Sequence, residues 1–155
     1  MYTLLLVDDD RAILEMLSLA LDRPGLHLLT ARNKTRAAYL IGHHPVDAAV
    51  LDVQLTTANQ REGLDLLRLL RQNHPNAQAI VLTGAPDADL EEAAYDAGAV
   101  FFLRKPLSLP DLQRELLKLG LPDTNHQRPA AAASVRRSAE RGAAHHLRLR
   151  PATIS

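Results

Sequence analysis

Five short apolar runs alternate with helix-like segments along the first 121 residues, and this alternation is the strongest constraint on the fold. Each run is about four residues long and, apart from His27 in the second, apolar at consecutive positions. This pattern is typical of strands buried on both faces of a parallel sheet. The runs are Leu4–Val7, Leu26–Leu29, Ala48–Leu51, Ala79–Leu82 and Val100–Leu103. Most segments that follow them repeat leucine or alanine at helical spacing. Five strand–helix units predict an α/β fold, a five-stranded parallel sheet with helices on both faces.

Turn and cap residues mark the ends of the predicted helices. Asn33 and Ser108 stand where a side-chain oxygen can accept a hydrogen bond from a first-turn N–H group. Pro110 is tolerated in such a first turn, and Gly98 is suited to end a helix. These signals place the helix boundaries between the apolar runs.

The zero net charge of the 155 residues hides an uneven distribution. Residues 1–121 hold 12 Lys and Arg against 16 Asp and Glu, whereas residues 122–155 hold six Arg against two acids. The second segment also has few large aliphatic residues. We therefore predict one folded domain over residues 1–121 and a basic, disordered tail over residues 122–155. Six arginines in a tail are compatible with simple solvation or with an acidic partner.

Composition excludes several classes of protein and site. The chain has no cysteine, so disulfides, thiolate nucleophiles and thiolate metal sites are absent. No apolar run approaches the ~20 residues that span a bilayer, and the N-terminus lacks the basic region of a secretory signal. The paired histidines at 43–44 and 145–146 have no third ligand at suitable spacing. We expect a cytoplasmic protein that does not enter a membrane.

Charged and hydroxyl side chains follow four of the five runs, at the strand ends where open α/β sheets bind ligands. They are Asp8, Asp9 and Asp10 after the first run, Asp52 after the third, Thr83 with Gly84 after the fourth, and Arg104 with Lys105 after the fifth. Taken alone, the three consecutive aspartates are explained equally well as a turn and helix cap. If the first and third strands are neighbours, however, Asp8, Asp9 and Asp52 meet and repel one another by about 1–4 kcal/mol per pair.

A hard divalent cation would relieve that repulsion. An all-oxygen ligand set without His or Cys favours Mg²⁺ over zinc, and Mg²⁺ recruits phosphate oxygens. Thr83 can donate a hydrogen bond to such an oxygen, and Lys105 supplies a compact positive charge. The set predicts a phosphoryl-transfer site in which an aspartate is the acceptor.

Four motifs, each after a predicted strand, give the chain a close resemblance to the receiver domain of two-component response regulators. They are Leu5–Asp10, Ala49–Asp52, Ile80–Gly84 and Asp96–Pro106. The resemblance covers about residues 2–120 and implies the strand order 2-1-3-4-5. That order would bring the first and third runs together.

The resemblance also implies a role for each matching acid. Asp52 is expected to be the phospho-acceptor. Asp9 and Asp52 would bind Mg²⁺ directly, Asp8 through water, and the backbone carbonyl of Gln54 would complete the protein ligands.

Three further positions receive roles from the same resemblance. Thr83 would bind a phosphoryl oxygen, and Lys105 would pair with the phosphate through a loop with a cis Lys105–Pro106 bond. Phe102 occupies the position of the switch aromatic that turns inward when Thr83 moves, although a plain core aromatic is the alternative. Leu55 and Thr56 stand where the family often has Met-Pro, which leaves the dephosphorylation rate open.

The implied function is that of a single-domain response regulator, a switch and not an enzyme, with at most slow self-dephosphorylation. A sensor histidine kinase or phosphotransfer protein would donate the phosphoryl group, and the output would be binding to an unknown downstream protein, without a DNA-binding domain. Two alternatives remain. A small haloacid dehalogenase-like phosphohydrolase would use Asp8 and Asp10 but leave Asp52 idle, and a receiver-like scaffold would be constitutively active.

Overall fold

The computed structural model describes residues 1–53, 62–84 and 88–123, and in them strands and helices alternate as predicted. The strands are β1 (Tyr2–Val7), β2 (Leu26–Ala31), β3 (Ala48–Asp52), β4 (Gln78–Thr83) and β5 (Phe101–Arg104). The helices are α1 (Arg11–Leu21), α2 (Lys34–His43), α3 (Glu62–Asn73), α4 (Ala88–Asp96) and α5 (Leu109–Lys118). None of these helices is long and apolar enough to cross a bilayer.

The chain divides into two compact units, Met1–Pro122 and Asp123–Ser155. Everything described below belongs to the first unit. The predicted tail lies outside the described residues from position 124 onward.

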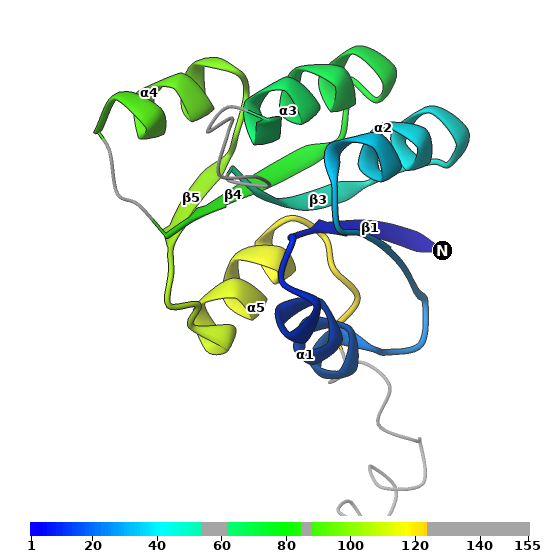
Figure 1. Cartoon of the computed structure of the whole chain (residues 1–155). Coiled ribbons are helices and arrows are strands. Elements are labelled where there is room, and N and C mark those ends of the chain that lie inside the picture. The colour runs from blue at the N-terminus through cyan, green and yellow to red at the C-terminus, as the bar shows by residue number, and fades with distance from the viewer. Residues whose placement is uncertain (54–61, 85–87, 124–155) are drawn as a thin grey trace, which may run out of the picture. The chain divides into compact units, whose positions relative to one another are not determined.

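The five strands form one parallel sheet in the order β2-β1-β3-β4-β5, which confirms the expected order. Helices α2, α3 and α4 cover one face and α1 and α5 cover the other (Figure 1). β1 is an interior strand: Leu6 lies opposite Thr30 of β2 on one side and Val50 of β3 on the other. Because β1 and β3 are neighbours, their carboxyl ends meet at one edge of the sheet.

The sheet separates two apolar clusters, and this explains why the strands read as continuous apolar runs. In β1, Leu5 and Val7 pack on the side of α2, α3 and α4, while Leu4 and Leu6 pack on the side of α1 and α5. None of the four is more than 1% exposed. Each such side chain contributes about 1.5–3 kcal/mol by leaving water, so both faces of the central strands stabilise the fold.

The second run differs from the prediction of a strand buried on both faces. In β2, Leu29 and Ala31 are buried, but Leu26 and Leu28 are only partly buried, and His27 and Thr30 are exposed. β2 is an edge strand, so it has one neighbouring strand and incomplete helix cover. Its leucines are still needed, because Leu29 packs in the apolar cluster on one face of the sheet and Leu26 and Leu28 pack against the cluster on the other face.

Side-chain caps begin the helices at the predicted residues. Asn33 accepts a hydrogen bond from the Arg36 N–H at 2.8 Å, and Ser108 accepts one from the Asp111 N–H at 3.4 Å. Asp10 accepts from the N–H groups of the first turn of α1. Gly98 ends α4 with a φ of 105°, a conformation that favours glycine.

Candidate functional site

Three carboxylates converge at the carboxyl ends of β1 and β3, as the strand order requires. Asp8 and Asp9 directly follow β1, and Asp52 is the last residue of β3. One carboxylate oxygen from each residue lies within 4.8 Å of the others. The predicted meeting of these acids is therefore present in the structure, whereas their roles as metal ligands and phospho-acceptor stay predictions.

The three acids differ in burial. The side chains of Asp8 and Asp52 are 2% and 3% exposed, while Asp9 is open to solvent. The Asp10 N–H donates to Oδ1 of Asp8 at 2.9 Å, which holds this carboxylate in place. Asp10 itself turns to α1 as its N-cap. The cluster is thus a buried pair with one accessible member, and Asp10 lies outside it.

Lys105 contacts both members of the buried pair and offsets one of their two negative charges. Its Nζ donates to Oδ2 of Asp8 at 2.9 Å and to Oδ2 of Asp52 at 3.0 Å. Burial alone would lower the pKa of Lys105, but the hydrogen bonds and charges of the two aspartates outweigh it and raise that pKa. Lys105 is therefore a firmly protonated cation at neutral pH.

The backbone around Lys105 ties this cation to the adjoining strand. The Lys105 N–H donates to the carbonyl of Thr83 at 2.7 Å, and the Lys105–Pro106 bond is cis, as expected. A Cβ placed on Gly84 would lie 3.9 Å from the lysine Cδ, so the glycine borders the lysine side chain. Thr83 is fully buried at the end of β4. Thr83 and Lys105 are thus linked through their backbones at the ends of the neighbouring strands β4 and β5.

Asp9 is the member of the cluster whose ionised form is disfavoured. Although the residue is exposed, partial burial is the first cause that raises the pKa of Asp9, followed by its interactions with Asp8. Three carboxylates and one ammonium leave two negative charges at the cluster. The donor set consists of oxygens only, without His or Cys, and this chemistry fits a hard dication such as Mg²⁺ better than zinc.

Phe102 lies in the core on the side of α2, α3 and α4, with 8% of its surface exposed. Its partner in the sheet register is Val81 of β4. This position suits a core aromatic and equally a switch aromatic, so the switch role of Phe102 remains a prediction.

Gly63 is a site residue that the sequence reasoning missed. A Cβ at this position would lie 2.5 Å from the Asp52 carbonyl oxygen and 2.6 Å from the Val53 Cα. The start of α3 thus packs directly on the backbone of the buried acid. A glycine in the second position of a helix was the available signal, but its meaning depends on how closely α3 approaches β3.

Part of the predicted site cannot be compared with the structure. The carbonyl of Gln54, and the departures at Leu55 and Thr56, lie outside the described residues.

Comparisons with known proteins give one consistent relationship. Residues 4–117 match the family model of the response regulator receiver domain. The chain is 36% identical over 117 residues to the response regulator protein PilR of Pseudomonas aeruginosa, which covers 76% of this chain and 25% of PilR. This chain spans less than two thirds of the length of the curated relatives that it matches.

Solved structures agree in fold. A CheY-like receiver domain protein from Methanospirillum hungatei JF-1 superposes with a TM-score of 0.70 at 27% identity, over 77% of this chain and 94% of that one. A response regulator from Burkholderia pseudomallei superposes with a TM-score of 0.66 at 26% identity, over 90% of this chain and 75% of that one. That structure is described as having a phosphorylated aspartic acid, a calcium ion and citrate.

Proposed function

This chain belongs to the response regulator receiver domain family, and from that premise we propose that Asp52 accepts a phosphoryl group and switches a protein-binding surface. One observation carries the proposal. The buried carboxylate of Asp52 lies beside two further carboxylates and in contact with Lys105, at the end of the sheet where α/β folds bind ligands. A lone structural ion pair would not need the second and third acids.

The acid cluster would hold Mg²⁺. Asp9 and Asp52 are the direct ligands in this proposal, Asp8 acts through water, and the Gln54 carbonyl completes the set. When bound, the ion offsets the carboxylate repulsion and the negative charge of the incoming phosphoryl oxygens. Asp9, the exposed member, faces the solvent from which the ion arrives.

Asp52 is the nucleophile in the proposed reaction. A carboxylate oxygen of Asp52 forms a bond to phosphorus while the bond from phosphorus to the donor breaks, and the donor keeps the electron pair. Lys105 already contacts Asp52 and can move one N–H from a carboxylate to a phosphoryl oxygen. The Thr83 hydroxyl donates to another phosphoryl oxygen. Positioning and charge stabilisation, more than acid–base chemistry, carry the step.

The product is an acyl phosphate that carries about two negative charges in place of the single charge of the Asp52 carboxylate, beside β4 and β5. Thr83 and Lys105 follow the new oxygens, and both lie at the ends of strands that adjoin α4 and α5. The surface formed by α4, β5 and α5 is thereby shifted between two states, with Phe102 as the aromatic that moves with Thr83.

The remaining assignments follow from this reading. A sensor histidine kinase or phosphotransfer protein supplies the phosphoryl group in the cytoplasm, and a downstream protein reads the switched surface. The chain itself turns over no substrate apart from slow self-dephosphorylation. The phosphorylated aspartic acid of the Burkholderia pseudomallei neighbour supports this scheme.

Acetyl phosphate labelling tests the acceptor. With Mg²⁺, intact-mass spectrometry should detect one added phosphoryl group, and Asp52→Asn should abolish it. Asp65→Asn, which removes an exposed carboxylate from α3, is the matched control and should label normally. Labelling of Asp52→Asn at the wild-type level, with loss in Asp8→Asn instead, would favour the phosphohydrolase chemistry and refute the proposal.

A further inference from the structure

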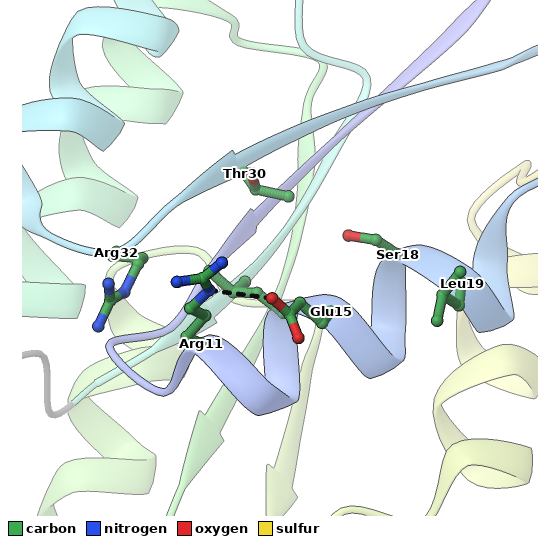
Figure 2. A pocket seen from close by; sticks show the side chains of 7 residues that line it. Arg11, Glu15, Ser18, Leu19, Thr30 and Arg32 are labelled. Atoms are coloured by element: carbon green, nitrogen blue, oxygen red, sulfur yellow. Dashed lines mark hydrogen bonds and ion pairs between the residues drawn. The ribbon is translucent and has the colours of Figure 1, made fainter.

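A groove lies between α1 and the edge strand β2; it adjoins the carboxylate cluster through Arg32, but none of the cluster's acids lines it. Its volume is about 590 Å³, within the range of about 300–1,000 Å³ that is usual for small-molecule sites. Two arginines, Arg11 and Arg32, lie at one end, and Ser18 and Leu19 lie at the other (Figure 2). The charged guanidinium groups are therefore gathered at one end of the groove, away from Leu19.

Among the residues that line the groove, Glu15 offsets only one of the two positive charges of Arg11 and Arg32. Nε of Arg11 pairs with Oε1 of Glu15 at 2.9 Å, as the dashed line in Figure 2 shows. Arg32 has no ion pair with a carboxylate among the residues that the structure describes, and one of its terminal nitrogens donates to the Asp9 carbonyl at 3.4 Å. Two guanidinium groups and one carboxylate leave one positive charge, within a unit whose net charge is negative.

The other walls are apolar or carry hydroxyl groups. Leu14 forms a wall that is 6% exposed, and Leu19 is 83% exposed beside it. Ser18 of α1 and Thr30 of β2 offer hydroxyl groups from opposite sides. Small-molecule sites commonly combine such an apolar lining with a few polar groups that fix orientation.

We propose that this groove binds a small organic anion, with its carboxylate or phosphate on Arg32 and Arg11 and its apolar body against Leu14 and Leu19. A guanidinium group presents paired N–H donors that match a carboxylate or phosphate. Arg32 is the main anchor because Glu15 already occupies one edge of Arg11. The combination of head group and apolar body distinguishes this ligand from a simple inorganic ion.

Backbone ¹⁵N–¹H NMR titrations of the full chain, without divalent ions, test the proposal with defined probes. Phenylphosphonate and phenylacetate carry the two candidate head groups on an apolar ring. Inorganic phosphate and benzyl alcohol carry only the head or only the ring. At least one aryl anion should give saturable shifts at the amides of Leu14, Ser18 and Arg32, with about tenfold higher affinity than either partial probe, and the tighter one identifies the head group.

Variants link the binding to the arginines. The double variant Arg11→Gln/Arg32→Gln should weaken binding of the aryl anion about tenfold or more, whereas Arg36→Gln, exposed on α2 outside the groove, should not. Asp52→Asn should bind as wild type does, so this result is independent of phosphorylation. Unchanged affinity in the double variant, non-saturating shifts, or shifts centred on Asp8, Asp52 and Lys105 would each overturn the proposal.

Discussion

Replacing Asp9 by asparagine is expected to stabilise the metal-free protein, because the fold holds this carboxylate against two others of the same charge. The raised pKa of Asp9 has burial as its first cause and the neighbouring Asp8 as its second. An aspartate with a raised pKa in the folded state costs stability as the pH rises through that pKa. The gain from Asp9→Asn is therefore present at pH 7, should fade as the pH falls through the raised pKa, and should be absent below the unfolded-state pKa of about 4.

The magnitude follows from the cluster geometry. At the 4.8 Å limit of the cluster, one pair of like charges repels by about 0.9 kcal/mol at a dielectric constant of 80 and about 3.5 kcal/mol at 20. Asp9 is exposed, so the lower figure applies better, and attraction to Lys105 offsets one of the two repulsions. We expect a net gain of about 1 kcal/mol in the free energy of unfolding.

Urea unfolding in EDTA and in excess MgCl₂ measures this gain. For a domain of this size, 1 kcal/mol moves the midpoint by about 0.3–1 M urea. Wild type should gain stability from MgCl₂, and Asp9→Asn should gain much less because it lacks one of the proposed ligands. Glu92→Gln removes an exposed acid from α4 and serves as the charge control, with no change beyond about 0.5 kcal/mol.

Asp8→Asn sharpens the contrast. Its carboxylate accepts from Lys105 and from the Asp10 N–H, so its loss should destabilise the protein in EDTA. If Asp9→Asn were less stable than wild type without metal, the carboxylate would be contributing a favourable contact. The account of the cluster as a repulsive site awaiting a cation would then be wrong.

Three further predictions concern residues away from Asp9. Gly63→Ala should cost about 1–3 kcal/mol in urea melts and slow acetyl phosphate labelling, because the new methyl group would displace the Asp52 backbone. Burial, followed by the charge of Asp47, raises the pKa of Tyr2 to about 12. The free energy of unfolding should therefore fall by about 1 kcal/mol between pH 10 and 12, a figure discounted for the partial exposure of the side chain. In urea melts over this pH range, Tyr2→Phe should not show this fall. Deleting residues 123–155 should change stability by less than about 1 kcal/mol and leave labelling intact, and a loss of several kcal/mol would show that the tail packs on the domain.

The alternation of strands and helices was predictable because each element carries its own local signal. Consecutive apolar residues in β1, β3 and β4 reflect burial on both faces, and side-chain caps reveal helix starts. The buried face of α1 shows the limit of such signals. The structure buries Leu14 with Leu17 and Leu21, while the neighbouring Ile13 is only partly buried. Apolar residues surround that turn on several sides, so spacing alone does not select the buried one.

The candidate site was predictable only as far as strand order allows. Residues at the carboxyl ends of adjacent parallel strands must meet, and this is why Asp8, Asp9 and Asp52 could be grouped. The double contact of Lys105 was not foreseen, since it depends on where a loop after β5 returns. The close packing of Gly63 against Asp52 likewise depends on the distance between α3 and β3, which no local pattern encodes.

The residues that contact one another in the site are far apart in the sequence, and this affects the order in which the site forms during synthesis. Lys105 and Asp8, which contact each other, are 97 residues apart along the chain. β1 pairs with β3 as well as with β2. It therefore lacks its second neighbour until β3, residues 48–52, has left the ribosome. Closing such long loops is entropically costly and slow compared with helix formation. A nascent chain that already displays Asp52 therefore lacks the lysine that contacts it. Under the proposed function, competence to accept a phosphoryl group should arise only once translation has passed β5.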